Sequence, residues 1–311
     1  MKSKKIFQFG FLLFAASLLV ITGCKKENTT TTNGDSSSVQ ELSQDENNMQ
    51  KCNDEIDNDI NKVMNGNGQE KSTMGIPCNA TVDSSTVVND TITLYITYNG
   101  HNCNNKLFRT GQVEIKKKTG THWYQAGATV TVVYKNLKIT RVATGKSITM
   151  NGTKIHENVS GGLLFMVGTY INSLVNKEWG ALSCTFDDGT AKVWNVARQI
   201  TYTGSLGAFV MTIDGFGTSG NYQNLVMWGT TRNGKVFYDQ IQVSLILKEA
   251  CDFDPCSGVK VITMPENNSG ATLTFGYDSN NQLITNGDCP SKYKVDWYHG
   301  SASGTIYLWL R

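Results

Sequence analysis

Thr91-Ile-Thr-Leu-Tyr-Ile-Thr-Tyr98 (TITLYITY) decides the fold class, because its large apolar side chains recur at every second position. A period of two is typical of a β-strand with one face against a core. Later runs share its richness in Val, Ile, Thr and aromatic residues. They are GATVTVVYKNLKIT (127–140), AKVWNVARQITYT (191–203), NLVMWGTTRNGKVFYDQIQVSLIL (224–247) and SGTIYLWL (303–310).

Turn signals separate these runs, and no strong amphipathic helical pattern lies between them. Parallel strands joined by helices are therefore not expected, and the sheet should be mostly antiparallel. We predict an all-β body over residues 77–311, either sandwich-like or a curved extended sheet. The predicted turns are Asn99-Gly100, Asn151-Gly152, Asp188-Gly189, Asn233-Gly234 and Asn286-Gly287.

Two segments of the body need a separate interpretation. The run GGLLFMVGTYINSLV (161–175) fits either a buried strand pair or a short helix. Gly215 to Gly220 matches the spacing GxGxxG, but a strand-like run follows it instead of the helix that a dinucleotide site needs. We interpret it as a glycine-rich hairpin.

Residues 39–66 are predicted to form an amphipathic helix, because apolar side chains recur there at steps of three, four and seven. Within it, Asp57-Asn58-Asp59 resembles the start of a calcium loop. An EF-hand would need Gly at 62 and Glu at 68, where this chain has Lys62 and Gly68, so we reject that site. The apolar positions are Leu42, Met49, Cys52, Ile56, Ile60, Val63 and Met64.

The first 23 residues have the order of a bacterial lipoprotein signal peptide. A basic start is followed by an apolar run and by Ile21-Thr22-Gly23-Cys24, which resembles a lipobox. We expect cleavage before Cys24, lipidation of its sulfur, and stable anchoring through its acyl chains. Residues 24–38 are rich in Thr, Asn and Ser and are expected to be a flexible tether. The sequence thus predicts a cell-envelope protein, in the outer membrane, with the leaflet left open.

Removing residues 1–23 leaves 25 Lys and Arg against 26 Asp and Glu, so the mature chain has a formal charge of about −1. No basic surface for nucleic acid is implied. The cationic run Lys116-Lys117-Lys118 closes a strand-like segment and is interpreted as a solvated strand end.

Seven cysteines follow Cys24, an odd number in a compartment where disulfides persist. Residues 78–106 and 256–292 look like one repeated unit, each a cysteine, a strand, a turn and a second cysteine. We therefore predict the disulfides Cys78–Cys103 and Cys256–Cys289, with Cys251 as the competitor for Cys289. Cys52 is expected to be a free thiol, and Cys184 and Cys251 are left undecided.

No motif for catalysis, metal binding or a cofactor stands out, so we predict no catalytic residues, no metal and no cofactor. The four histidines are far apart in sequence and are interpreted as surface or turn residues, and Asp187-Asp188 as a turn. Asp278 to Asn280, with Asp252, Asp254 and Asp288, is a weak calcium candidate. Among the six tryptophans, Trp123, with its neighbour Tyr124, is the best candidate for an exposed ligand-binding aromatic.

RTGQVEIKKK (109–118), AGATVTVVYKNLKI (126–139) and MNGTKIHENVS (150–160) resemble a family of uncharacterised Bacteroidota lipoproteins. Arg109, Gly111, Gly152 and Asn158 match its loose pattern, whereas Pro290-Ser291 departs from it. The resemblance implies a lipobox, a tether, a short helix and an all-β body, without an established activity. We expect a non-enzymatic binding or scaffolding role, with a glycan or another envelope protein as partner. A surface glycan-binding lipoprotein and a glycan-active hydrolase are the alternatives.

Overall fold

A computed structural model of the chain describes residues 37–65 and 76–310, all within one unit, Asn33–Arg311. They form one long helix, α1 (Ser37–Asn65), and a single sheet of 15 strands. The strands are β1 (Ala80–Ser84), β2 (Thr91–His101), β3 (Leu107–Lys118), β4 (Ala128–Arg141), β5 (Ser147–Asn158), β6 (Leu174–Phe186), β7 (Ala191–Thr203), β8 (Val210–Gly215), β9 (Gly217–Ser219), β10 (Tyr222–Thr230), β11 (Val236–Lys248), β12 (Pro255–Met264), β13 (Ser269–Tyr277), β14 (Lys292–His299) and β15 (Ala302–Trp309).

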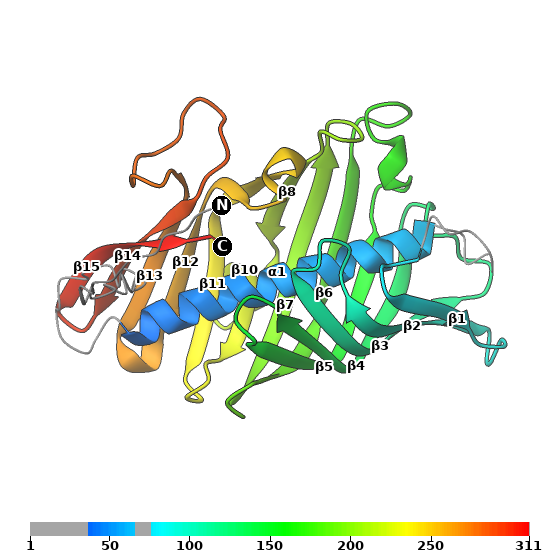
Figure 1. The fold of residues 1–311 in the computed structure, drawn as a ribbon, viewed down its shortest axis with the longest axis horizontal. Helices are drawn as coiled ribbons and strands as arrows, with labels where there is room; N and C mark the ends of the chain where they lie inside the picture. Colours follow the sequence, from blue (N-terminus) through cyan, green and yellow to red (C-terminus); the bar gives the residue numbers. More distant parts are fainter. Residues whose placement is uncertain (1–36, 66–75, 311) are drawn as a thin grey trace, which may run out of the picture. The chain divides into compact units, whose positions relative to one another are not determined.

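All pairings between these strands are antiparallel, as the sequence predicts, and most join neighbours in the chain. The order departs from this meander once: β10 lies beside β7, while β8 bridges β7 and β11 and β9 pairs with β10. The result is one extended curved sheet, not two separate stacked sheets. Figure 1 shows α1 crossing the face around which the sheet curves.

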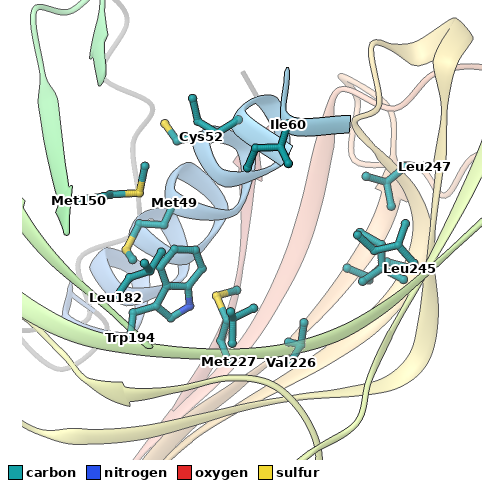
Figure 2. Packing of buried hydrophobic residues seen from close by; sticks show 14 of the residues in the cluster. Met49, Cys52, Ile60, Met150, Leu182, Trp194, Val226, Met227, Leu245 and Leu247 are labelled. Atoms are coloured by element: carbon teal, nitrogen blue, oxygen red, sulfur yellow. The ribbon is translucent and has the colours of Figure 1, made fainter. Parts of the chain in front are cut away.

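The predicted apolar face of the helix is confirmed: its seven apolar side chains are all buried. Figure 2 shows Met49 of α1 directed at Leu182 and Trp194 of the sheet. Alternate residues of β7, including Trp194, Val196 and Ile200, are buried on the same face. The period of two in the strands and the helical period in α1 therefore meet in one core, and burial of this apolar surface is the main stabilising term.

Two predicted turns are wrong. Asn99-Gly100 lies within β2 and Asn151-Gly152 within β5. Gly152 has a φ of 137°, and a Cβ there would lie 2.3 Å from the carbonyl oxygen of Ala181 in the next strand. Glycine is thus required by a close approach between strands of the curved sheet, and the sequence signal for a turn marks such a bend equally well.

The two segments with a separate interpretation, 161–175 and 215–220, have short local structures. The run 161–175 contains one turn of 3₁₀ helix, η2 (Leu164–Met166), followed by the start of β6. Gly215 to Gly220 is the expected glycine-rich hairpin, since β9 pairs antiparallel with β10. Two further 3₁₀ turns are η3 (Glu249–Cys251) and η4 (Pro265–Asn267).

Candidate functional site

The polar side of α1 is also covered by the sheet, which the prediction of an amphipathic helix did not include. Asn53 and Asp57, one helical turn apart, are buried, and Asp54 between them is partly buried. Asn53 Nδ2 donates to Asp57 Oδ2 at 2.6 Å, which fixes the carboxylate relative to the helix. This side of the helix therefore presents carboxylates to the interior.

A row of charged side chains on the sheet faces these carboxylates, and strand register aligns the row. His156 of β5 pairs with Glu178 of β6, which pairs with Arg198 of β7. Lys154 lies two residues before His156 on the same face, opposite Gly180. The three side chains of the row and that of Lys154 are all buried.

Lys154 is the centre of the cluster. Its Nζ lies 2.8 Å from Asp57 Oδ1 and 2.8 Å from Glu178 Oε2, and it donates to Asn53 Oδ1 at 2.7 Å. The ammonium group has three hydrogens, so these three acceptors satisfy it. A fully buried lysine with complete hydrogen bonding joins the helix to two strands at once.

Arg198 makes the second junction. Its Nη2 lies 2.5 Å from Asp54 Oδ1 and 2.9 Å from Asp57 Oδ2, and its Nε donates to Glu178. Three carboxylates thus face two fixed cations. Because a buried net charge is costly, this imbalance favours retention of one proton by the carboxylates.

The pKa shifts follow that charge balance. Burial, together with the neighbouring Glu178, raises the pKa of Asp57 to about 8, and burial raises that of Asp54. For Glu178 burial alone would raise the pKa, but Arg198 and Lys154 hold it well below its ordinary value. Burial, reinforced by Lys154, lowers the pKa of His156 to about 3. The histidine is therefore neutral at ordinary pH, with its Nε2 facing Asp57 Oδ1 at 3.6 Å.

Asp57, His156 and Glu178 have ligand atoms within 4.8 Å of one another, a spacing that suits a metal ion. The Lys154 ammonium bonds to both carboxylates of that trio. A divalent ion would need to displace this ammonium beside the second fixed cation, Arg198, against their repulsion. The trio is better explained as the acceptor shell of an internal lysine, and the calcium-like Asp57 to Asn61 lies in a continuous helix.

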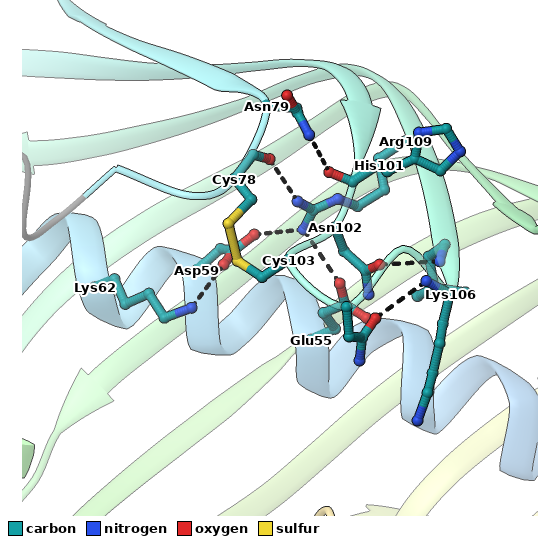
Figure 3. Close-up of a disulfide and its surroundings, with 12 residues drawn as sticks. Glu55, Asp59, Lys62, Cys78, Asn79, His101, Asn102, Cys103, Lys106 and Arg109 are labelled. Atoms are coloured by element: carbon teal, nitrogen blue, oxygen red, sulfur yellow. Dashed lines mark hydrogen bonds and ion pairs between the residues drawn. A yellow bond between two sulfur atoms is a disulfide. The ribbon is translucent and has the colours of Figure 1, made fainter.

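Similar ion pairs continue along α1. Figure 3 shows Arg109 of β3 next to Asp59, Glu55 and the carbonyl of Cys78. The distance from Arg109 Nη1 to Asp59 Oδ2 is 2.6 Å. Toward the start of the helix, Lys192 binds Glu46 and Arg232 binds Asp45, with Nη2 to Oδ1 at 2.6 Å. Acidic groups along the helix are thus matched by cations from the sheet and, through Arg232, from the β10–β11 turn.

The expected exposure of the aromatic pair Trp123 and Tyr124 holds for one of the two residues. Trp123 is buried, and its carbonyl accepts a hydrogen bond from Asn158 at 2.7 Å, so its expected exposure is wrong. Tyr124 is exposed and stacks on His122 with ring centroids 5.2 Å apart. Trp309, on the edge strand β15, is the tryptophan that is exposed in the described part of the chain.

One of the two predicted disulfides is confirmed. Cys78 bonds to Cys103, with 5.3 Å between their Cα atoms. The pairing of Cys256 with Cys289 is wrong: Cys289 bonds to Cys251, and Cys256 is a half-buried free thiol. Cys251 ends the turn η3 beside the loop that carries Cys289, whereas Cys256 has already entered β12. The predicted repeat unit 256–292 therefore does not contain both cysteines of the second disulfide.

The remaining predictions concern the other cysteines, the histidines, the Asp187-Asp188 turn and the tether. Cys52 is free as expected, and so is Cys184; both are buried. His156 contradicts the expectation of surface histidines because strand register places it on the covered face. Asp187-Asp188 lies at the predicted turn between β6 and β7. Cys24 and the tether lie outside the described residues, apart from the last two tether positions, which begin α1.

Two cavities beside the helix are small. One of about 40 Å³ is lined by residues that include Lys51 and Asp254, and one of about 200 Å³ lies at Glu41, Asp45 and Arg232. Both are smaller than the roughly 300–1,000 Å³ of typical small-molecule sites. In the residues described, no helix is long and apolar enough to span a bilayer.

Comparisons with family models, with curated proteins and with solved structures found no match to this chain. The resemblance to Bacteroidota lipoproteins therefore stays a prediction.

Proposed function

We propose that this protein is a lipid-anchored envelope lipoprotein with a non-enzymatic binding or scaffolding role. One observation carries the second part: the face around which the sheet curves is filled by the chain's own helix, through buried ion pairs. A substrate cleft on that face would require the helix to leave. A partner would then bind to the outer surface of the sheet or to its loops.

The anchor rests on the sequence around Cys24, and the two disulfides are in keeping with an exported protein. The test replaces Cys24 with Ser in the full chain. We expect loss of acyl incorporation and release from the membrane fraction, while the folded body is unchanged. Membrane retention without acylation at position 24 would contradict the anchor.

The glycan-active hydrolase is less well supported. Asp57 and Glu178 are two close carboxylates, as such an enzyme requires, but Lys154 lies between them and both are buried. We expect purified mature protein to hydrolyse no polysaccharide, ester or peptide. Turnover that is lost in Glu178→Gln, with the fold intact, would overturn this expectation.

The glycan-binding alternative depends on exposed aromatics, and Tyr124 and Trp309 are the relevant ones. Tyr124 lies in the β3–β4 loop and Trp309 on the edge strand β15. Isothermal titration with soluble glycans would separate this alternative from scaffolding, since a binding signal should vanish in Tyr124→Ala or Trp309→Ala.

A further inference from the structure

Three loops meet at one end of the sheet: β3–β4 (119–127), β5–β6 (159–173) and β7–β8 (204–209). The first two are joined by the Gly162 amide, which donates to the carbonyl of Tyr124 at 2.8 Å. The last two are in contact, since a Cβ on Gly168 would lie 2.3 Å from the carbonyl oxygen of Gly204. We call these three loops the rim; Figure 1 shows the segments after β5 and β7 beyond the same ends of the strands.

The rim exposes large apolar and aromatic side chains. The exposed fractions are 46% for Tyr124, 57% for Phe165, 78% for Tyr170 and 78% for Leu206. Tyr170 and Leu206 are the most exposed large hydrophobic residues in the described part of the chain. One exposed apolar residue needs no explanation, but four on three adjoining loops indicate a surface that contacts something.

The rim also lacks charged residues. Residues 119–134, 158–176 and 199–213 contain no Asp, Glu, Lys or Arg. Glu249 of η3 reaches the third loop, where its Oε2 accepts a hydrogen bond from the Phe209 amide at 3.0 Å. Entry of the rim into an apolar medium would therefore desolvate few ionic groups, and the cost of such entry is low.

We propose that the rim dips into the interfacial layer of the lipid bilayer to which the chain is anchored, which rests on the lipid anchor proposed above. Aromatic and leucine side chains on uncharged loops favour the headgroup–acyl boundary. The run Lys116-Lys117-Lys118 ends β3 just before the first rim loop, but Lys116 pairs with Glu114 at 3.6 Å and Lys118 with Asp90 at 3.7 Å, and these pairs reduce its attraction for anionic lipids. Thirteen residue steps separate Cys24 from Ser37, so the tether extends to at most about 45 Å.

That tether makes a weak contact effective. Four partly inserted side chains give a modest affinity for free protein, but anchoring holds the rim at a high local concentration near the same bilayer. The anchor thus keeps the protein at the membrane, and the rim fixes which end of the sheet faces it.

Hydrogen exchange on the lipidated full chain tests the orientation. On phosphatidylcholine vesicles, amides of 159–173 and 204–209 should exchange about tenfold more slowly than in the unlipidated Cys24→Ser chain in solution. Equal exchange in the two states overturns the bilayer as the occupant, even if a protein or a glycan binds the rim. The turn at Asp188-Gly189, at the opposite ends of β6 and β7, should show no change.

Vesicle flotation of the Cys24→Ser chain tests the rim without the anchor. Replacing Tyr124, Phe165, Tyr170 and Leu206 with Ser should lower partition to phosphatidylcholine vesicles about tenfold, with little dependence on salt. The matched control replaces four exposed residues away from that end of the sheet, Val142, Val193, Val243 and Tyr298, with Ser. Equal partition of the two variants would overturn membrane contact by the rim. Absence of acylation at Cys24 would overturn only the lipid anchor.

Discussion

Arg198 lies directly opposite Glu178 in the β6–β7 ladder, and its Nε donates to that carboxylate. Strand register alone brings these two side chains together, before the helix takes part. Asp54 and Asp57 of α1 then bind to this pair through Nη2 of Arg198. The ion cluster therefore has a part fixed by the sheet and a part supplied by the helix, and each part can be tested.

Lys154→Met should lower the free energy of unfolding by about 3–5 kcal/mol, because it leaves Asp57 and Glu178 buried without their shared cation. Urea unfolding followed by far-UV circular dichroism measures this loss. Lys235→Met removes an exposed pair with Glu266 at 3.8 Å and should cost less than about 1 kcal/mol. Equal losses in both variants would refute the central role of Lys154.

Asp57→Asn should change how stability depends on pH between about pH 4 and pH 8. The pKa of Asp57 is about 8 in the folded chain against 3.8 for the ordinary group, so between these values the folded state holds a proton that the unfolded state has lost. Stability from this group therefore falls as pH rises through that window.

In Asp57→Asn that fall is absent, and we expect its stability relative to wild type to improve by roughly 1–3 kcal/mol between pH 6 and pH 9. Asp188→Asn, at an exposed turn, serves as the control. The same loss of stability between pH 6 and pH 8 in wild type and in Asp57→Asn would show that Asp57 does not hold the excess carboxylate proton.

His156→Gln should make the protein less sensitive to acid. The folded pKa of His156 is lowered to about 3 from the usual 6.5, so the unfolded state binds a proton that the folded state excludes. Stability is lost as pH falls through this range, at about 1.4 kcal/mol per pKa unit. Between pH 6 and pH 4 the variant should lose roughly 2 kcal/mol less than wild type; His122→Gln, in a loop, should behave like wild type.

Peptide mapping under non-reducing conditions should find Cys78 joined to Cys103 and Cys251 joined to Cys289. Cys256 should be the first thiol to react with maleimide in the folded protein, since it is half-buried. Cys52 and Cys184 should react only on unfolding, because burial raises the pKa of both thiols to about 12. Opening either disulfide by Ser substitution should cost about 3 kcal/mol, whereas Cys256→Ser should leave both disulfides intact.

The periodic signals in the sequence were sufficient for the fold class and for the apolar face of the helix. Leu42, Met49 and Ile56 could be assigned to the core because each step corresponds to the helical period. The buried polar side could not be assigned in this way, because acidic residues on a helix are more often solvated. Gly100 and Gly152 give a misleading turn signal for a similar reason, since a bend inside a strand and a turn between strands use the same residue.

A signal for the ion cluster was nevertheless present. In AKVWNVARQITYT (191–203), Lys192 and Arg198 fall in step with Trp194, on the face that is buried. Residues 37–65 contain seven Asp and Glu against two Lys, while residues 76–310 contain 19 Lys and Arg against 16 Asp and Glu. The complementary charges predict attraction between helix and body. Which acid meets which base depends on the curvature of the sheet, and no local pattern encodes that.

The position of α1 at the start of the chain has a consequence for biogenesis. Its ionic partners, such as Lys154, Arg198 and Arg232, are synthesised about 100–190 residues later, and a helix with five excess negative charges gains little stability alone. Docking of the helix must therefore wait for contacts of large sequence separation, which form slowly. In an emerging chain of this design, α1 stays undocked until these partner residues have been synthesised.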